Sequence, residues 1–222
     1  MELGRPIKHT DKSHRKLAKL PKESRELAEF FGIMLGDGGI NNDWQANITL
    51  NSEADAVYGK YVARYCSKLF GVHPAVRKRK DRKALVISLA STTVVNFLVE
   101  KGLVRGSKIK GNAHIPEWIQ VKKTYRKACV RGLMDTDGCL YIHDHQVLQK
   151  RYRNIGLCFS SHASGILNGV AAIFEEFGII PHITNKGTRI YLYSEHAVAR
   201  YLAVFGTSNP RIQKVYEEWK RG

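Results

Sequence analysis

The feature that most constrains the fold is an internal repeat, because two stretches of the chain recur in the same order. Residues 32–38 (GIMLGDG) correspond to residues 132–138 (GLMDTDG), 100 positions later. Residues 70–76 (FGVHPAV) correspond to residues 177–183 (FGIIPHI), with the Phe-Gly pair and the proline at the same offsets. Two matching pairs in one order indicate a duplication, so we expect two similar halves related by a pseudo-two-fold axis.

Hydrophobic periodicity predicts an α+β chain in which each half follows the order helix, two strands, helix, two strands, helix. In the first half the expected helices are 24–38, 53–70 and 91–101, and the expected strands include 46–51, 72–79 and 85–90. In the second half the expected helices are 124–138, 163–177 and 195–205, and the expected strands include 139–143, 155–160 and two shorter ones. Residues 144–153 are expected as an insertion between two of these strands. The predicted domains are a basic arm at 1–20, a first repeat with linker at 21–121, and a second repeat with tail at 122–222.

The charge of the chain indicates a polyanionic partner. Lys and Arg total 36 against 20 Asp and Glu, which gives a net charge of +16. Nucleic acid is the partner that such a balance favours. The chain contains no apolar run long enough to span a membrane, no signal peptide and no paired cysteine motif. We therefore expect an intracellular protein that is neither secreted nor membrane-bound, with reduced cysteines.

The repeated Asp-Gly pairs predict a carboxylate centre. In each half a glycine, Gly32 or Gly132, lies five residues before an Asp-Gly that ends an apolar helix. Because glycine is costly inside a helix, its recurrence predicts that the two helices cross closely. Asp37 and Asp137 would then meet at the negative ends of both helices, where a hard divalent cation is favoured. Beside a polyanion, such cations promote phosphoryl displacement.

Residues 30–38 (FFGIMLGDG) and 130–138 (VRGLMDTDG) resemble the two motifs of the LAGLIDADG homing endonucleases, and the resemblance extends from about Ser24 to Trp219. It implies a monomeric, intron-encoded enzyme that cuts both strands of a specific DNA site and leaves short 3′ overhangs. It also implies a saddle of two antiparallel sheets, with the two motif helices packed as a central pair. Leu35 and Asp135 occupy a variable motif position that faces away from the metals.

The same resemblance assigns the centre of the site. Asp37 and Asp137 are implied as metal ligands, with the carbonyl groups of Gly36 and Thr136 as supplementary ligands. Lys108 is the best match for a lysine near the metals, and its second-half counterpart is either Arg211 or Lys214. The implied cofactor is Mg²⁺, with Mn²⁺ able to substitute and Ca²⁺ supporting DNA binding without cleavage.

Strand alternation adds a row of residues expected to face double-stranded DNA, because every second residue of a half-buried strand points away from the core. The predicted DNA-binding residues are Asn47, Thr49, Asn51, His73, Arg77, Arg79, Arg153, Asn154, Ser160, Arg189, Tyr191 and Tyr193. Residues 76–83 form a strongly basic turn that suits phosphate contacts.

Two other functions are open to such a chain. A non-cleaving LAGLIDADG protein, such as a maturase that binds its own intron RNA, would keep the fold and the charge. Aspartic proteases also carry one Asp in each of two similar halves, but those acids lie in Asp-Thr/Ser-Gly turns of an all-β fold. The predicted helices and the basic charge disfavour the protease.

Overall fold

The computed structural model describes residues 18–184 and 186–221, so most of the predicted basic arm at 1–20 lies outside the described residues. The first half comprises α1 (Arg25–Gly36), β1 (Gly38–Ile40), β2 (Gln45–Asn51), α2 (Ala56–Phe70), β3 (Ala75–Lys78), β4 (Ala84–Ala90) and α3 (Thr92–Glu100). The second half comprises α5 (Lys123–Asp137), β5 (Gly138–Val147), β6 (Lys150–Ser160), α6 (Ser164–Glu176), β7 (His182–Ile183), β8 (Arg189–Leu192) and α7 (Glu195–Val204). A short helix, α4 (Glu117–Gln120), precedes α5, and α8 (Pro210–Arg221) follows α7.

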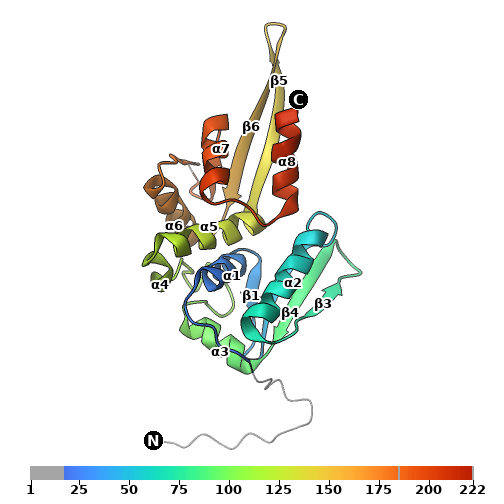
Figure 1. The fold of residues 1–222 in the computed structure, drawn as a ribbon, viewed down its shortest axis with the longest axis vertical. Coiled ribbons are helices and arrows are strands. Elements are labelled where there is room, and N and C mark those ends of the chain that lie inside the picture. Colours follow the sequence, from blue (N-terminus) through green and yellow to red (C-terminus); the bar gives the residue numbers. More distant parts are fainter. Residues whose placement is uncertain (1–17, 185, 222) are drawn as a thin grey trace, which may run out of the picture.

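The two halves share one topology. Each contains a four-stranded antiparallel sheet, with strand orders β1-β2-β4-β3 and β5-β6-β8-β7. The predicted α+β fold with two αββαββα repeats is therefore confirmed. In Figure 1 the two sheets lie in opposite halves of an elongated molecule, with α1 and α5 side by side between them. The domain boundary that the sequence predicts between residues 121 and 122 stays a prediction.

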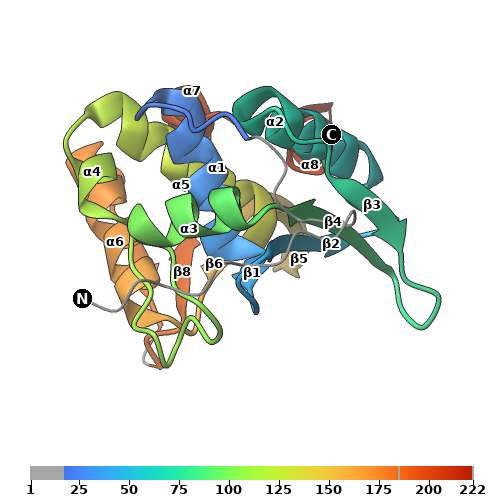
Figure 2. The same ribbon diagram turned by 90° about the horizontal axis from the view of Figure 1, so that it is seen from below.

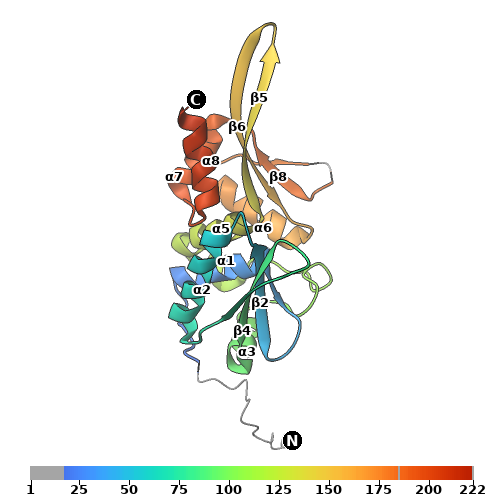
Figure 3. The same cartoon turned by 90° about the vertical axis from the view of Figure 1, so that its right-hand side faces the viewer.

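Helices cover one face of the sheets. Figures 2 and 3 show α2 and α8 on the same side of the strands. In β2, Ala46, Ile48 and Leu50 are buried, whereas Asn47 and Thr49 point to the opposite side and are half-buried and exposed. We call this second side of each sheet the open face.

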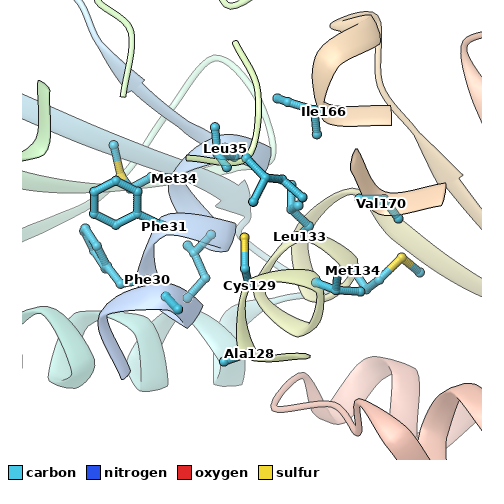
Figure 4. Packing of buried hydrophobic residues seen from close by; sticks show 14 of the residues in the cluster. Phe30, Phe31, Met34, Leu35, Ala128, Cys129, Leu133, Met134, Ile166 and Val170 are labelled. Carbon is cyan, nitrogen blue, oxygen red and sulfur yellow. The ribbon is translucent and has the colours of Figure 1, made fainter. Parts of the chain in front are cut away.

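Local sequence explains why the central helices start and approach each other as they do. The Ser24 hydroxyl accepts a hydrogen bond of 3.1 Å from the Leu27 amide and so caps α1 as predicted. Apolar side chains of both helices then form a shared core, in which Cys129 and Leu133 of α5 point toward α1 (Figure 4).

The structure corrects three local predictions. Residues 144–153 are not an inserted loop, because β5 and β6 pair continuously to the turn at Leu148 and Gln149. The strand expected at 72–79 is only Ala75–Lys78. The order of elements predicted a strand at the place of β1 without giving its bounds, and the helices α4 and α8 were not predicted.

Among the described residues, none of the helices has both the length and the apolar character that crossing a membrane requires.

Candidate functional site

The site begins with the crossing of α1 and α5. A Cβ atom built on Gly32 collides with the carbonyl oxygen of Cys129, and one built on Gly132 collides with the carbonyl oxygen of Glu29. Each glycine therefore lies against the backbone of the other helix, as the sequence predicted. This close approach brings the C-terminal ends of both helices together.

Asp37 and Asp137 lie at these two helix ends. Asp37 directly follows α1, and Asp137 is the last residue of α5. A Cβ atom built on Gly36 would lie 3.4 Å from Oδ2 of Asp137, which shows how closely the second acid approaches the end of the first helix. The two predicted acids therefore share one partly buried centre.

The electrostatics of this centre favour a bound cation. Burial, and after it the charge of the Asp137 carboxylate, raise the pKa of Asp37 from its ordinary value of 3.8 to about 7. Burial also raises the pKa of Asp137 to about 6. Lys108 opposes both increases, since its ammonium group stabilises the charged carboxylates. The pair therefore carries a negative charge that one lysine only partly neutralises.

Lys108 reaches the centre from the segment after α3. Its ammonium group donates a hydrogen bond to the carbonyl oxygen of Gly36. Burial lowers the pKa of Lys108, whereas the Asp137 and Asp37 carboxylates raise it. The ammonium group thus stands among the oxygens that the sequence assigned to a metal ion.

The donor set fits hard divalent cations. Asp37 and Asp137 supply carboxylate oxygens, the Gly36 carbonyl that accepts from Lys108 lies beside them, and Thr136 lies against Gly36. Oxygen donors of this kind suit Mg²⁺, Mn²⁺ or Ca²⁺. The described residues contain no group of three or more His, Cys, Asp or Glu side chains that could hold a metal alone. Water or a ligand's own oxygens would have to complete the coordination.

Arg211, rather than Lys214, is the second-half basic residue at this centre. Its Nη2 lies 3.4 Å from the carbonyl oxygen of Gly138, the residue directly after Asp137. Its Nε donates to Oδ1 of Asp55 at 3.0 Å, and its charge lowers the pKa of Asp37. Lys214 is exposed on α8.

Asp135 points away from the carboxylate pair, as the resemblance implied. Its Oδ1 accepts a hydrogen bond from the Thr207 hydroxyl, and its Oδ2 accepts one of 2.8 Å from the Ser208 amide. The Ser208 hydroxyl in turn donates to Glu29 at 3.0 Å, and Glu29 pairs with Arg131. Asp135 therefore ties the α7–α8 loop to the helix pair.

In the first sheet, the predicted contact residues divide into several groups. Asn47 lies on the open face, where its Oδ1 accepts from Ser88 at 2.7 Å. Thr49 shares that face, and its amide donates to the Asp37 carbonyl at 3.0 Å, so it adjoins the centre. Asn51 instead caps a turn through the amides of Glu53 and Ala54.

At the edge of the first sheet, the structure agrees with the prediction for Arg77 and Arg79 but not for His73. Arg77 pairs with Val86 on the open side, and Arg79 pairs with Asp81 at 3.0 Å in the exposed turn. His73 precedes β3, and its Nδ1 is hydrogen-bonded to Ser67 of α2 at 3.2 Å. We therefore do not count His73 among the open-face residues.

The open face of the second sheet holds Asn154, Ser160, Arg189, Tyr191 and Tyr193. Ser160 pairs with Arg189, and the rings of Tyr191 and Tyr193 stack with centroids 5.3 Å apart. The prediction that Arg153 faces DNA is wrong, because residues 153 and 154 point to opposite sides of one strand. It shares the side of buried Ile155, and its Nε lies 3.8 Å from Asp144.

Sequence reasoning missed several polar residues. His143, His145 and Tyr152 also lie on the open side of the second sheet, and no apolar alternation marks this exposed part of their strands. Glu29 and Asp55 are buried acids whose partners lie in distant segments, so no local signal marks them.

The raised pKa of Asp37 gives the first prediction, on stability without added divalent cations. Between about pH 4 and pH 7 the folded protein binds more protons than the unfolded chain, so the free energy of unfolding falls as pH rises. Asp37→Asn should remove part of this fall and stabilise the metal-free protein at pH 8 by on the order of 1–3 kcal/mol. Urea unfolding at pH 5 and pH 8 measures it.

Two controls accompany this measurement. Asp81→Asn should leave the fall in stability unchanged, since Asp81 is exposed and Arg79 lowers its pKa. Mg²⁺ should restore the stability of the wild type at pH 8 more than that of Asp37→Asn. An identical pH dependence in wild type and Asp37→Asn would contradict the electrostatic account.

Part of the chain matches a known protein family. Residues 124–218 match the family model described as a LAGLIDADG-like domain. A search of the curated proteins finds no match to the sequence.

Several solved structures share the fold. The meganuclease I-SmaMI, bound to uncleavable DNA, is similar with a TM-score of 0.59 and 8% identity, covering 89% of this chain and 90% of that chain. I-DmoI in complex with DNA and Mn has a TM-score of 0.53 and 14% identity, with coverages of 83% and 98%. Full-length DUF199/WhiA from Thermatoga maritima has a TM-score of 0.50 and 15% identity, with coverages of 90% and 62%.

Proposed function

Because residues 124–218 match the LAGLIDADG-like family model and the fold is that of solved homing endonucleases, we propose that this chain is a LAGLIDADG protein and a site-specific endonuclease that hydrolyses both strands of double-stranded DNA. The observation that carries the proposal is the pair Asp37 and Asp137 at the crossing of α1 and α5, with Lys108 beside both. In a protein that only bound DNA, two buried carboxylates near the DNA phosphates would add electrostatic repulsion without any benefit.

The open faces of the two sheets supply the DNA-binding surface in this proposal. A duplex lying across them would pass over the carboxylate pair, since β1 and β5 both start directly after the two acids. Asn, Arg and Thr side chains on such a face suit hydrogen bonds to base edges in the major groove. The net charge of +16 favours phosphate contacts on both sides.

Each residue at the centre then has a chemical task. Asp37 and Asp137 would hold divalent cations, with the Gly36 and Thr136 carbonyl groups as further ligands. Bound there, such ions lower the pKa of water and neutralise charge on the phosphate oxygens. Lys108 supplies a fixed positive charge that stabilises the negative charge developing on the phosphate.

The cofactor follows from the same ligands and from the solved relatives. I-DmoI has been solved in complex with DNA and Mn and in complex with DNA and Ca. We propose Mg²⁺ as the natural ion of this chain, with Mn²⁺ as a substitute and Ca²⁺ as a support for binding alone. We further propose that the enzyme is intron-encoded, monomeric and intracellular, and that it leaves short 3′ overhangs.

DNA binding tests the proposal before cleavage is measured. A duplex selected from a randomised library should bind in Ca²⁺, with an affinity whose logarithm falls linearly with the logarithm of salt concentration by about 0.9 for each phosphate contact. An affinity that is indifferent to salt would refute the nucleic-acid function. Specific binding without cleavage in Mg²⁺ or Mn²⁺ would favour the non-cleaving alternative, and the precursor intron RNA should then be tested as a ligand.

A second prediction concerns the basic residue of the second half. Arg211→Ala should slow cleavage about tenfold or more, because it removes a positive charge beside Asp37. Lys214→Ala is the matched control and should cleave like the wild type, since Lys214 is exposed on the same helix. The measurement is single-turnover cleavage, with thermal unfolding to confirm that Arg211→Ala still folds. A larger loss in Lys214→Ala would reverse the assignment.

A further inference from the structure

The two halves differ most in the length of their first hairpin. In the first half, β1 is 3 residues long and its pairing with β2 ends at Ile40 and Ala46. In the second half, β5 is 10 residues long and pairs with β6 as far as Val147 and Lys150. We call the hairpin formed by residues 138–160 the long ribbon. It projects far beyond the rest of the molecule in Figures 1 and 3.

Within residues 18–184 and 186–221, most of the long ribbon has no third strand beside it. The neighbouring strand β8 pairs only with residues 157–160 at its base. Isolated two-stranded ribbons are marginally stable in water, so the exposed part needs other support. Its shape must therefore be maintained by side chains.

Two sets of contacts provide this support. The rings of His143 and His145 stack with centroids 4.8 Å apart, and His145 stacks on Tyr152 across the ribbon at 5.5 Å. On the other side, Trp219 of α8 donates from Nε1 to the carbonyl oxygen of Arg153 at 3.1 Å. The long ribbon is thus stiffened on one side by rings and on the other by α8.

The support leaves one side of the long ribbon available to a partner. His143, His145, Tyr152 and Asn154 point away from the side that α8 contacts, and they continue the open face that holds Ser160. Lys150 adds positive charge beside Tyr152, with Nζ 5.6 Å from the ring centre. A polar, positively charged two-stranded ribbon has the dimensions of the DNA major groove.

We infer that the long ribbon reads base pairs in the outer part of one DNA arm, where the first half has no counterpart, so that the target site has unequal arms. This inference rests on the proposed function. The seven additional residues of β5 extend it by about 24 Å at about 3.4 Å per residue. With about 3.4 Å between base pairs, the second arm is longer by up to about 7 base pairs.

The test is selection from a duplex library with a wide randomised centre, followed by sequencing of the bound duplexes in Ca²⁺. Sequence preference should extend farther from the centre on one side than on the other. Two residues with exposed amide side chains, Asn154 on the open side of the long ribbon and Gln146 on the opposite side, then serve as test and control. Asn154→Ala should erase preference at an outer position of the longer arm and weaken binding of the selected duplex about tenfold or more. Gln146→Ala should bind like the wild type.

The outcomes separate the two proposals. Equal arms, or an Asn154→Ala variant that keeps its outer preferences, would overturn the unequal-arm inference and leave the proposed endonuclease intact. Failure to enrich any duplex would overturn the DNA-binding function and the inference with it. Equal melting temperatures of Asn154→Ala, Gln146→Ala and the wild type verify that the long ribbon is folded in each.

Discussion

Replacing Asp37 or Asp137 by Asn is expected to lower double-strand cleavage at least about a hundredfold while binding to the selected duplex is retained. Either substitution removes one of the two carboxylates that we propose as metal ligands. Binding should not weaken, because the open faces are unchanged and less negative charge remains beside the phosphates. Plasmid linearisation in Mg²⁺ and duplex binding in Ca²⁺ measure the two effects separately.

Asp135→Asn is the control for these variants. Asp135 lies two residues before Asp137, about 200° around the helix, and its carboxylate binds the Thr207 hydroxyl and the Ser208 amide. The substitution should reduce the free energy of unfolding by about 1–3 kcal/mol and leave cleavage near the wild-type rate. Full linearisation by Asp37→Asn or Asp137→Asn would refute the assigned ligands. Loss of cleavage in a folded Asp135→Asn protein would mean that the other acid of this helix binds the metal.

Gly32→Ala and Gly132→Ala are expected to have the largest effects on stability. A Cβ atom at either position collides with backbone of the opposite helix, and backbone cannot turn aside as a side chain can. Moving the helices apart would open the core that both halves share. We expect losses of about 3 kcal/mol or more in the free energy of unfolding, or failure to fold.

Gly39→Ala is the matched substitution. Among the residues that the structure describes, no atom lies within 4 Å of a Cβ built on Gly39, and the backbone of Gly39 does not require a positive φ angle. Its effect should stay within about 0.5 kcal/mol. Urea unfolding followed by circular dichroism compares the three variants. Near-wild-type stability of both Gly32→Ala and Gly132→Ala would contradict the close crossing of α1 and α5.

The sequence predicted the parts of the molecule that depend on repetition. The duplicated segments predicted two halves, and the glycines of the repeated motif predicted the helix crossing that brings Asp37 near Asp137. These predictions succeeded because each feature recurs, so a chance pattern in one half could be checked against the other. The choice between Arg211 and Lys214 needed the structure, because both follow the last predicted helix at plausible spacing.

The features that sequence reasoning missed depend on distant partners or on surfaces without a buried side. The outer part of the long ribbon is exposed on both faces, so it lacks the apolar alternation that marks a strand. The helix α8 is highly charged, and we expected only a tail there. Asp135 is buried because the loop at Thr207 and Ser208 folds over it, a contact between residues more than 70 positions apart.

Sequencing of newly formed DNA ends tests the central claim most directly. The wild-type protein is incubated with the selected duplex in Mg²⁺, and in parallel with EDTA or with the double variant Asp37→Asn and Asp137→Asn. We predict breaks in both strands at fixed positions a few base pairs apart, in the wild type with Mg²⁺ alone. Specific binding without new ends in Mg²⁺ or Mn²⁺, or equal cleavage by the double variant, would contradict a nuclease centre built on these two acids.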